Sequence, residues 1–406
     1  MLRALPKRIW EALRRRVRRR PRHPVIWNVN GANERHCNKY ALLVYLPRAF
    51  QMSPDDPAFL SHANLRRCRH IAADLGERGY IVDAMHKSDL RFRPRRHYTL
   101  VISERLDWKK IASRFRANAT HVFLASSMNH VTHNGNVRRR HARLSERGRS
   151  PVRVRRVYGE NMPAVARSDA LVAVGNAFTT GTWREAIEGP VYAFNGFALR
   201  AGILPHDTPK DFIRTRRRFL FFASSSQMQK GLDLLLEIFP RHPELQLYVC
   251  SQFANEEDFC SAYRQELFET ANVHPLGWTT VNSPEFMELL RTCAFVIHPT
   301  CSEGQAGSVV HCMHSGLIPL VTREAGIDTG DFGLTLSNDS IEEIERTVLD
   351  MSQRPPEWLR DRSAKTARSA AALYTEETFR KRWADIVTEV LARRSGADAK
   401  RASRLH

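Results

Sequence analysis

Short runs of apolar residues alternate along this chain with segments whose apolar residues recur every three or four positions. The runs have the length of buried strands, and the segments have the spacing of helices that face a core. Strands are predicted in the first half at 40–46, 80–85, 98–103, 121–127 and 170–176, and in the second half at 219–226, 245–251, 294–298, 317–322 and 333–336. Strands that alternate with helices in this way indicate an α/β protein built on doubly wound parallel sheets.

The length and the pattern predict two such domains joined by a charged, proline-containing linker. A helix at 63–78 belongs to the first domain, and a helix at 375–393 is expected to end the ordered chain. The predicted parts are a basic amphipathic segment at 1–28, an N-terminal domain at 38–200, a linker at 201–218, a C-terminal domain at 219–372, a terminal helix at 373–394 and a disordered tail at 395–406.

The most informative stretch is 294–316, where an apolar strand leads through a loop of small residues into a helix. The loop contains Glu303, Gly304 and Gly307, so free backbone N–H groups and the positive end of a helix dipole meet beside one carboxylate. In an open parallel sheet this place is the carboxyl edge, where ligands bind. The pattern therefore predicts a site for a phosphorylated ligand.

Four pieces in this order resemble the GT-B glycosyltransferases, in particular the large sugar-nucleotide-dependent retaining family that includes many enzymes of bacterial surface polysaccharide synthesis. They are the strand, loop and Lys-Gly pair at 219–239, the turn at Gly277, the Pro-x-x-x-Glu-Gly loop at 299–304 and the Gly-Leu-Ile-Pro-Leu-Val run at 316–321. The element at 190–198 also resembles the strand-Asn-Gly piece that closes the N-terminal domain in that family. The resemblance implies two Rossmann-like domains that face a central cleft, and transfer of a sugar from a nucleotide-diphosphate sugar to a glycan or lipid-linked acceptor.

The resemblance also implies roles for individual residues. Lys230, with Ser225 and Ser226, is expected to bind the donor diphosphate, and Glu303 to act beside the donor sugar as a catalytic residue. An ammonium at this place would neutralise the leaving diphosphate. The residues expected around the donor sugar and nucleotide are Gly304, Gln305, Ala306, Gly307, Ser308, His311, Gly277 and Trp278.

Two positions depart from the family's pattern. His311 stands where the family has a second acid for the ribose, and Ser225 stands where it has an arginine for the diphosphate. An imidazole offers fewer hydrogen bonds than a carboxylate, and a serine cannot replace a charged guanidinium fork. In the first domain, His130 or His133 is expected to supply the family's histidine near the donor sugar, and His130 is taken as the catalytic candidate. His62, Asn64 and Arg66 are the candidates on the acceptor side.

Charge changes the picture of possible partners. The 63 Lys and Arg residues outnumber the 43 Asp and Glu residues, which gives a formal net charge of +20. Such a charge attracts nucleic acid, anionic membrane surfaces or negatively charged substrates. Residues 1–24 have apolar residues at near-helical spacing among ten basic ones, which leaves open a helix on the inner face of the cell membrane, a disordered tail or a nucleic-acid contact. The basic stretch 129–156 is expected to be a solvated face or a groove for an anionic acceptor.

Composition narrows the chemistry further. Seven cysteines without Cys-x-x-Cys spacing predict neither a zinc site nor a disulfide framework, and Cys250 and Cys293 are expected to be core thiols in a reducing cytoplasm. No Asp-x-Asp sequence occurs, so no metal or other cofactor is expected. The alternatives to a transferase are a GT-B epimerase or hydrolase, and a non-catalytic basic protein that binds nucleic acid or a membrane.

Overall fold

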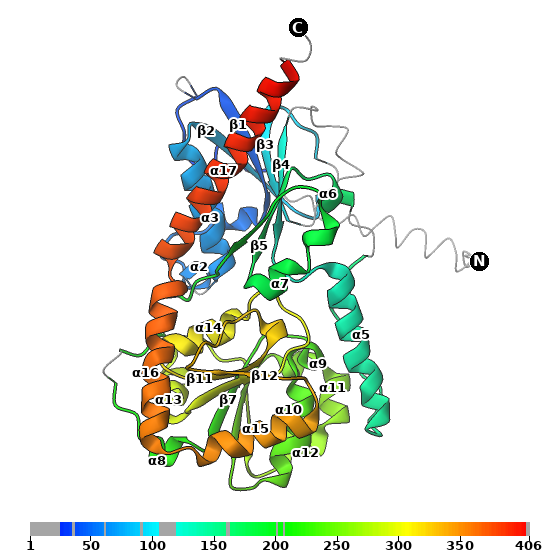
Figure 1. The fold of residues 1–406 in the computed structure, drawn as a ribbon, viewed down its shortest axis with the longest axis vertical. Helices are drawn as coiled ribbons and strands as arrows, with labels where there is room; N and C mark the ends of the chain where they lie inside the picture. The colour runs from blue at the N-terminus through cyan, green and yellow to red at the C-terminus, as the bar shows by residue number, and fades with distance from the viewer. Residues whose placement is uncertain are drawn as a thin grey trace, which may run out of the picture.

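The computed structural model describes residues 25–34, 37–60, 62–89, 92–104, 119–159, 163–199, 202–205 and 208–402. The predicted basic segment therefore lies almost entirely outside the described residues. The chain forms two α/β domains that lie one above the other along the long axis of the molecule (Figure 1). Each domain is built around one six-stranded parallel sheet.

The N-terminal domain holds a sheet with strand order β2-β1-β3-β4-β5-β6. Its inner strands are buried on both faces because helices cover them, which explains their continuous apolar runs. Its strands are β1 (Lys39–Tyr45), β2 (Tyr80–His86), β3 (Tyr98–Ser103), β4 (Thr120–Ala125), β5 (Ala170–Val174) and β6 (Val191–Phe194). Its helices are α2 (Pro57–Leu60), α3 (Ala63–Glu77), α5 (His130–Glu146), α6 (Pro163–Ala166) and α7 (Ala177–Gly181).

The C-terminal domain holds a sheet with strand order β12-β11-β10-β7-β8-β9. Its strands are β7 (Arg218–Phe222), β8 (Gln246–Cys250), β9 (Val273–Gly277), β10 (Phe295–His298), β11 (Ile318–Thr322) and β12 (Leu334–Leu336). Its helices are α8 (Phe212–Thr215), α9 (Gln227–Lys230), α10 (Leu232–Ile238), α11 (Glu257–Ala262), α12 (Arg264–Phe268), α13 (Pro284–Thr292), α14 (Gly307–His314), α15 (Ile341–Gln353) and α16 (Pro356–Leu373).

Each sheet reverses its winding direction once, and these places define where a ligand can bind. In the N-terminal sheet the reversal lies between β1 and β3, and in the C-terminal sheet it lies between β7 and β10. Loops diverge at such a point and leave a crevice at the carboxyl ends of the two strands. The loops after β7 and β10 carry Lys230 and Glu303, so the second crevice holds both residues that the sequence singles out.

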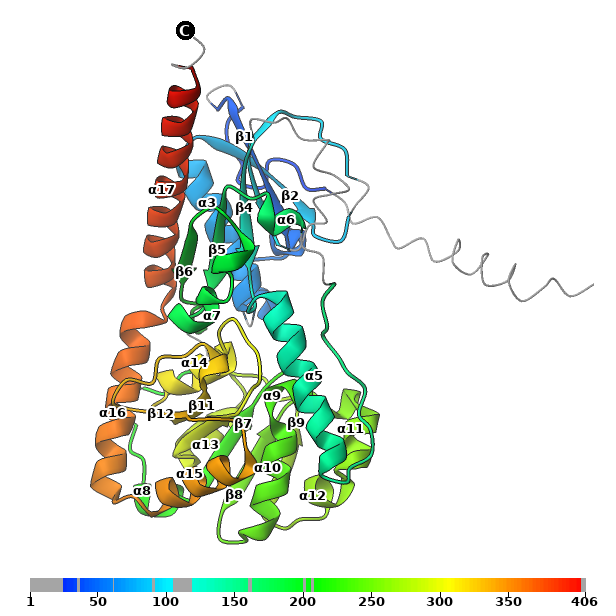
Figure 2. The ribbon, with the colours of Figure 1, turned by 45° about the vertical axis from the view of Figure 1, so that its right-hand side comes forward.

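The long final helix ties the two domains together. Helix α17 (Glu376–Ala402) follows α16 and turns back onto the N-terminal domain (Figures 1 and 2). Its apolar residues join the core of that domain, namely Phe379, Trp383, Ile386, Val387 and Val390. Glu376 at its start forms ion pairs with Arg66 and His70 of α3. The helix expected at 375–393 therefore packs on the first domain.

Three features of the helices were not predicted. Residues 257–268 form two short helices, α11 and α12, with Tyr263 buried between them. The 18-residue helix α16 was not predicted, because its few buried residues are widely spaced. Helix α17 continues to Ala402, through residues that were predicted to be a disordered tail.

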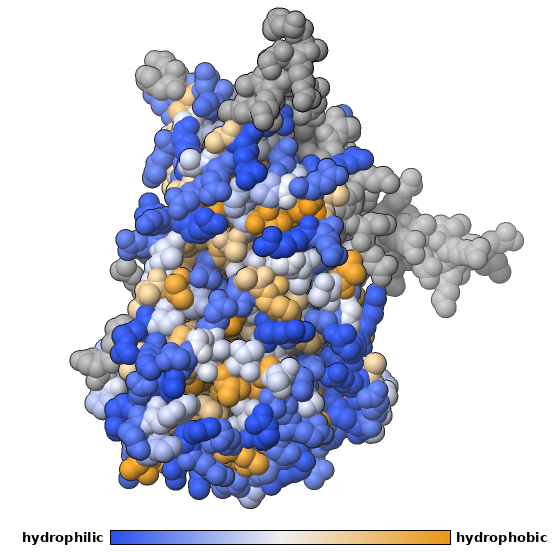
Figure 3. Space-filling view, in the orientation of Figure 1, coloured by the Kyte–Doolittle hydropathy of each residue, from blue (hydrophilic) through white to orange (hydrophobic). Residues whose placement is uncertain are grey.

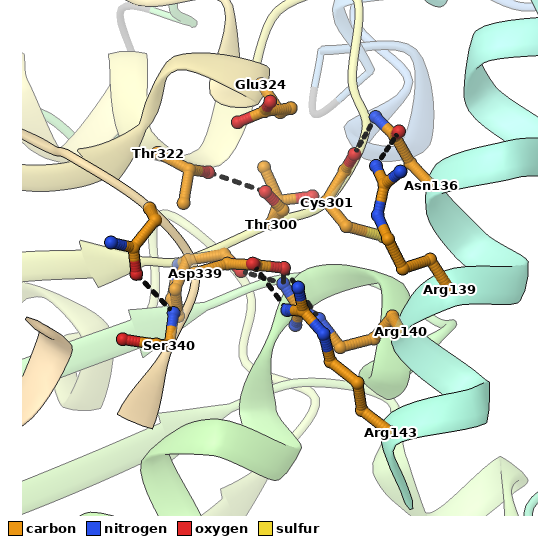
Figure 4. Close-up of polar contacts among 12 residues, drawn as sticks. Asn136, Arg139, Arg140, Arg143, Thr300, Cys301, Thr322, Glu324, Asp339 and Ser340 are labelled. Atoms are coloured by element: carbon orange, nitrogen blue, oxygen red, sulfur yellow. Dashed lines mark hydrogen bonds and ion pairs between the residues drawn. The ribbon is translucent and has the colours of Figure 1, made fainter. Parts of the chain in front are cut away.

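Much of the basic stretch 129–156 packs on the C-terminal domain instead of forming a solvated face. Helix α5 leaves the N-terminal domain and runs along the side of the C-terminal domain (Figure 2). Arg140 is only 1% exposed, and its guanidinium contacts Asp233 at 3.4 Å and Asp339 at 3.0 Å. Arg140 and Arg143 both point at Asp339, as Figure 4 shows, and Arg147 contacts Asp233 at 2.7 Å. Farther along, Arg149 pairs with Glu237 and Glu266, and Arg155 with Asp258.

The surface and the cysteines add two findings. The face in Figure 3 is largely hydrophilic, with small separated apolar patches. No helix within the described part of the chain is both long and apolar enough to cross a membrane. All seven cysteines are free, and Cys250 and Cys293 are buried in one apolar cluster, as predicted.

The buried charge network of α5 generates a stability prediction. Arg140→Met removes the buried guanidinium that donates to one Asp233 oxygen and to the carbonyls of Met228 and Pro299, and leaves Asp233 with Arg147 alone, so it is expected to destabilise the protein by about 3–5 kcal/mol. Arg139→Met on the exposed side of the same helix is the control, with an expected change within about 0.5 kcal/mol. Urea denaturation of both variants measures the difference, and equal losses would contradict a buried interdomain role for Arg140.

Candidate active site

A cavity of about 760 Å³ lies between the two domains. From the C-terminal domain it is lined by the loops after β7 and β10 and by the start of α14. From the N-terminal domain it is lined by residues that follow β1, β3 and β4 and by the start of α3. Both crevices of the two sheets therefore open into one space.

The loop after β7 positions Lys230 at this cavity. Lys230 ends the short helix α9, and Gly231 follows with φ +87°. A Cβ at position 231 would collide with the backbone carbonyl of Pro299, so glycine is required where the two loops cross. The chain then continues into α10. The Lys-Gly pair thus has a local structural cause besides any role for the lysine.

The loop after β10 brings Glu303 to the same wall, where its carboxylate forms an ion pair with the Lys230 ammonium. The two loops are also joined through Gln229. Its carbonyl accepts from Cys301 N at 2.9 Å, and its side-chain amide donates to the carbonyl of Ser302 at 2.6 Å. The structure therefore places the predicted lysine and the predicted carboxylate in direct contact at the edge of one cavity.

Burial shifts the pKa values of the ionisable groups at this pair. Burial and the positive charge of Arg156 lower the pKa of Lys230, whereas its contact with Glu303 favours the charged ammonium. His298, the last residue of β10, lies next to the pair, and its Nε2 is 3.6 Å from a Glu303 carboxylate oxygen. Burial, followed by the charge of Lys230, lowers the pKa of His298 well below its ordinary value, so this imidazole is neutral.

The N-terminal domain holds the Glu303 loop in place. Met128 N donates to the Glu303 carbonyl at 3.2 Å, and Asn136 of α5 donates to the Cys301 carbonyl at 2.8 Å (Figure 4). The side chain of Gln305 accepts from Gly196 N at 2.7 Å. Gly304 lies in the tightest part of this contact, where a Cβ would be 2.8 Å from Val174 Cγ1 and 2.9 Å from the Ser126 carbonyl. The loop is therefore an interdomain contact as well as a wall of the cavity.

The residues predicted around the donor fall into two groups. Gln305 and Gly307 line the cavity, whereas Gly304, Ala306 and Ser308 are not among its lining residues. Gly277 and Trp278 lie outside the cavity lining, and Trp278 is 57% exposed.

His311 also lies outside the cavity. Its Nε2 is 2.9 Å from the carbonyl of Gly202, and burial lowers its pKa to about 4. A neutral ring that donates to this carbonyl holds the linker against α14. The structure therefore gives His311 a role in linker packing, and its predicted contact with the nucleotide is not supported by its position.

The serines after β7 are placed differently from the prediction. Ser224 lines the cavity, whereas Ser225 and Ser226 do not. Ser226 has φ +73°, and its backbone N–H donates to the carboxylate of Glu256, which also accepts from Gln227 N at 3.3 Å. The amide groups at the start of α9 are thus already bound to an acid of the protein.

On the N-terminal side, the candidates are again divided. His133 lines the cavity, with Nδ1 2.9 Å from the Ser302 hydroxyl and Nε2 2.6 Å from the Arg156 carbonyl. His130 is buried against the rings of Tyr158 and Trp183, outside the lining, so the catalytic assignment to His130 is a poorer choice than His133. His62 and Asn64 line the cavity, but Arg66 is turned to Glu376.

Several cavity residues were missed from the sequence. They are charged or polar side chains of the N-terminal domain, namely Tyr45, Arg67, Lys87, Glu104 and Arg156. Glu104 directly follows β3 at the reversal of the first sheet, a position that the strand order could have indicated. Arg156 has φ +55°, an uncommon conformation for a non-glycine residue, which the sequence does not reveal.

The fold and the site together define a class. Two doubly wound domains enclose a cavity at the carboxyl edges of their sheets, and a lysine and a carboxylate meet at its wall. This is the arrangement of a protein that binds a phosphorylated ligand between two nucleotide-binding-type domains.

The sequence of the second domain is similar to a known family. Residues 216–354 match the family model described as "Glycosyl transferases group 1". This segment includes every strand of the second sheet, so the similarity covers the core of the C-terminal domain. No curated protein sequence matches the chain.

Solved structures extend the likeness to both domains. Sucrose-phosphate synthase from Thermosynechococcus elongatus covers 87% of this chain and 100% of its own, with a TM-score of 0.59 and 12% identity. HepE from Anabaena, solved in complex with UDP-glucose, covers the same shares with a TM-score of 0.56 and 14% identity. A glycosyltransferase from Rickettsia africae covers 87% of this chain and 99% of its own, with a TM-score of 0.53 and 10% identity. At these identities the likeness establishes the fold, and the predicted GT-B fold is confirmed.

The packing around Gly304 generates a second prediction. Gly304→Ala inserts a methyl group between the two domains and is expected to destabilise the protein by about 1–3 kcal/mol, because backbone on both sides must move. Gly307→Ala is the control for stability, since its Cβ meets nothing within 4 Å. Thermal melting of both variants tests this; a Gly304→Ala protein as stable as Gly307→Ala would show that the interdomain contact is looser than described.

Proposed function

We propose that this protein transfers a sugar from a nucleoside diphosphate sugar to an acceptor in the cavity between its domains. The observation that carries the proposal is the meeting of Lys230 and Glu303 at the reversal point of a domain that is similar to the group 1 glycosyltransferases. The proposal assigns no role to a metal ion. Retention of the anomeric configuration is the outcome expected by resemblance.

The donor diphosphate is proposed to bind between Lys230 and Arg156. Both residues line the cavity, and Arg156 lies close enough to lower the pKa of Lys230 after the larger effect of burial. No carboxylate among the described residues forms an ion pair with Arg156. A diphosphate would relieve the repulsion between the two cations, and these cations would then stabilise the charge of the leaving group.

Binding of the diphosphate would also free Glu303. In the structure this carboxylate is paired with Lys230. When the ammonium turns to phosphate oxygens, the Glu303 carboxylate can accept hydrogen bonds from sugar hydroxyls instead. The ion pair therefore serves as a resting arrangement of a donor site. That HepE was solved with UDP-glucose supports a uridine diphosphate sugar as the first donor to test.

The acceptor is proposed to enter from the N-terminal wall, where His62 and Asn64 lie. A role in surface polysaccharide synthesis, with residues 1–24 at the inner face of the membrane, remains part of the proposal. The non-catalytic nucleic-acid alternative is less well supported, because Arg140, Arg147, Arg149 and Arg155 are paired with carboxylates of the C-terminal domain. An epimerase or hydrolase would form its product without an added acceptor, which product analysis distinguishes.

Lys230 provides the first test of the donor site. Lys230→Met is expected to weaken UDP binding by about tenfold to a hundredfold, because a charge-assisted hydrogen bond contributes about 1.5–3 kcal/mol. Lys365→Met is the control, since Lys365 lies on the outer side of α16 and contacts Asp331 and Asp361. Titration calorimetry with UDP measures both. Absence of UDP binding to the unmodified protein, or equal binding by the two variants, would refute the proposed donor site.

Arg156 provides the second test. Arg156→Met is expected to weaken UDP binding by about threefold to tenfold, since an exposed cation contributes less than a buried one. Arg153→Met removes an exposed arginine three positions earlier, outside the cavity, and is expected to leave the dissociation constant unchanged. If both variants bind UDP alike at low and high salt, the diphosphate lies elsewhere.

A further inference from the structure

The N-terminal wall of the cavity contains a buried cation that forms no ion pair with a carboxylate of the described residues. Arg67 lies in the second turn of α3, lines the cavity and is only 4% exposed. Its Nε has no hydrogen-bond partner, and no acid of the described residues forms an ion pair with it. Burying a charge without a partner is unfavourable, so such a side chain calls for a compensating group.

Aromatic rings supply part of the compensation. The guanidinium lies over the rings of Phe194, at 5.0 Å, and Phe379, at 5.8 Å, and these contacts hold it in position. Phe379 belongs to α17 and Phe194 to β6, so three separate elements fix the guanidinium at the cavity wall. Rings stabilise a cation but do not satisfy its N–H donors, which stay available for a ligand.

The groups beside Arg67 also favour an anion. The cavity is lined by Ala63 and Asn64, the first residues of the 15-residue helix α3, whose first turn contains no acid. The positive end of this helix therefore faces the cavity. Tyr45 lines the same wall, and its buried hydroxyl lies next to the Arg67 guanidinium. His62 precedes the helix without capping it by its side chain.

The acids nearby do not neutralise this wall. Glu104 is buried, and its two carboxylate oxygens are engaged by the Lys87 ammonium and the Ser126 hydroxyl. Glu376 is paired with Arg66 and His70, outside the cavity lining. Arg67 and the start of α3 thus form a positive subsite, separate from Lys230 and Arg156, which come from other loops.

We infer that this subsite binds an acid group of the acceptor, either a phosphate ester or a carboxylate. The inference rests on the proposed function and specifies its substrate class: a sugar or glycan that carries an anionic substituent near the hydroxyl that reacts. The guanidinium donates to the anionic oxygens, and the Tyr45 hydroxyl and the first amides of α3 complete the contact. The two positive subsites give the diphosphate and the acceptor different places in one cavity.

The test uses the full chain saturated with UDP, so that the donor site is occupied. Hexose 6-phosphates, hexuronic acids, the matching neutral hexoses and inorganic phosphate are titrated against it by thermal shift and calorimetry. Sugars with an acid group, and phosphate alone, are expected to raise the melting temperature beyond the shift given by UDP, since binding to the folded state stabilises it. The phosphate and carboxylate arms show which acid the subsite prefers.

Arg67→Met is expected to weaken binding of the preferred anion by about tenfold or more while leaving the UDP dissociation constant unchanged. Arg67→Lys is expected to keep part of the affinity. Arg184→Met, on an exposed arginine of the N-terminal domain outside the cavity, is the control and is expected to bind as the unmodified protein does.

The outcomes separate the inference from the function on which it rests. If UDP binds but none of the anionic probes binds in a way that depends on Arg67, the acid subsite is refuted and the donor site stands. If UDP itself does not bind, the donor site fails. A purely structural Arg67 would instead show a lower melting temperature in Arg67→Met without ligand, and anion binding equal to that of the unmodified protein.

Discussion

The buried contact between Arg140 and Asp233 fixes the geometry on which the rest of the molecule depends. Arg140 comes from a helix of the N-terminal domain, whereas Asp233 lies in the first turn of α10, three residues after Lys230. The same guanidinium donates to the carbonyl of Pro299, at the start of the Glu303 loop. One side chain of the first domain therefore contacts both segments that carry Lys230 and Glu303. Because a buried charge must keep its partners, this contact restricts how far the two walls of the cavity can separate along α5.

The charge of the chain has a different meaning once its partners are known. A net charge of +20 suggests a surface that attracts polyanions. Along 140–155, however, four arginines are paired with carboxylates of the other domain: Arg140, Arg147, Arg149 and Arg155. These charges hold two domains together, so they contribute little to any external surface. Net charge alone thus could not distinguish a binding surface from an internal contact.

The fold was largely predictable, because strands buried on both faces are continuous apolar runs and their order along the chain determines the architecture. Lys230 and Glu303 were predictable for a related reason: Glu303 lies in the loop after the central strand β10, and Lys230 ends the short helix that follows the central strand β7. Arg67 and Arg156 were not, since one lies inside a helix and the other in an irregular segment, and their position at the cavity depends on contacts between distant elements. His311 was misjudged because its neighbour, the Gly202 carbonyl, comes from the linker, over a hundred residues earlier.

The cations that line the cavity in the described part of the chain are of two kinds. Two of its cations, Lys230 and Lys87, are paired with the acids Glu303 and Glu104. The other two, Arg67 and Arg156, have no carboxylate partner among the described residues and face the cavity from the N-terminal domain. The paired lysines can exchange their acids for ligand oxygens with little change in net charge, whereas the arginines gain a partner only from a ligand. The lining cations without a described carboxylate partner therefore come from the first domain, although the residues that the sequence makes recognisable lie in the second.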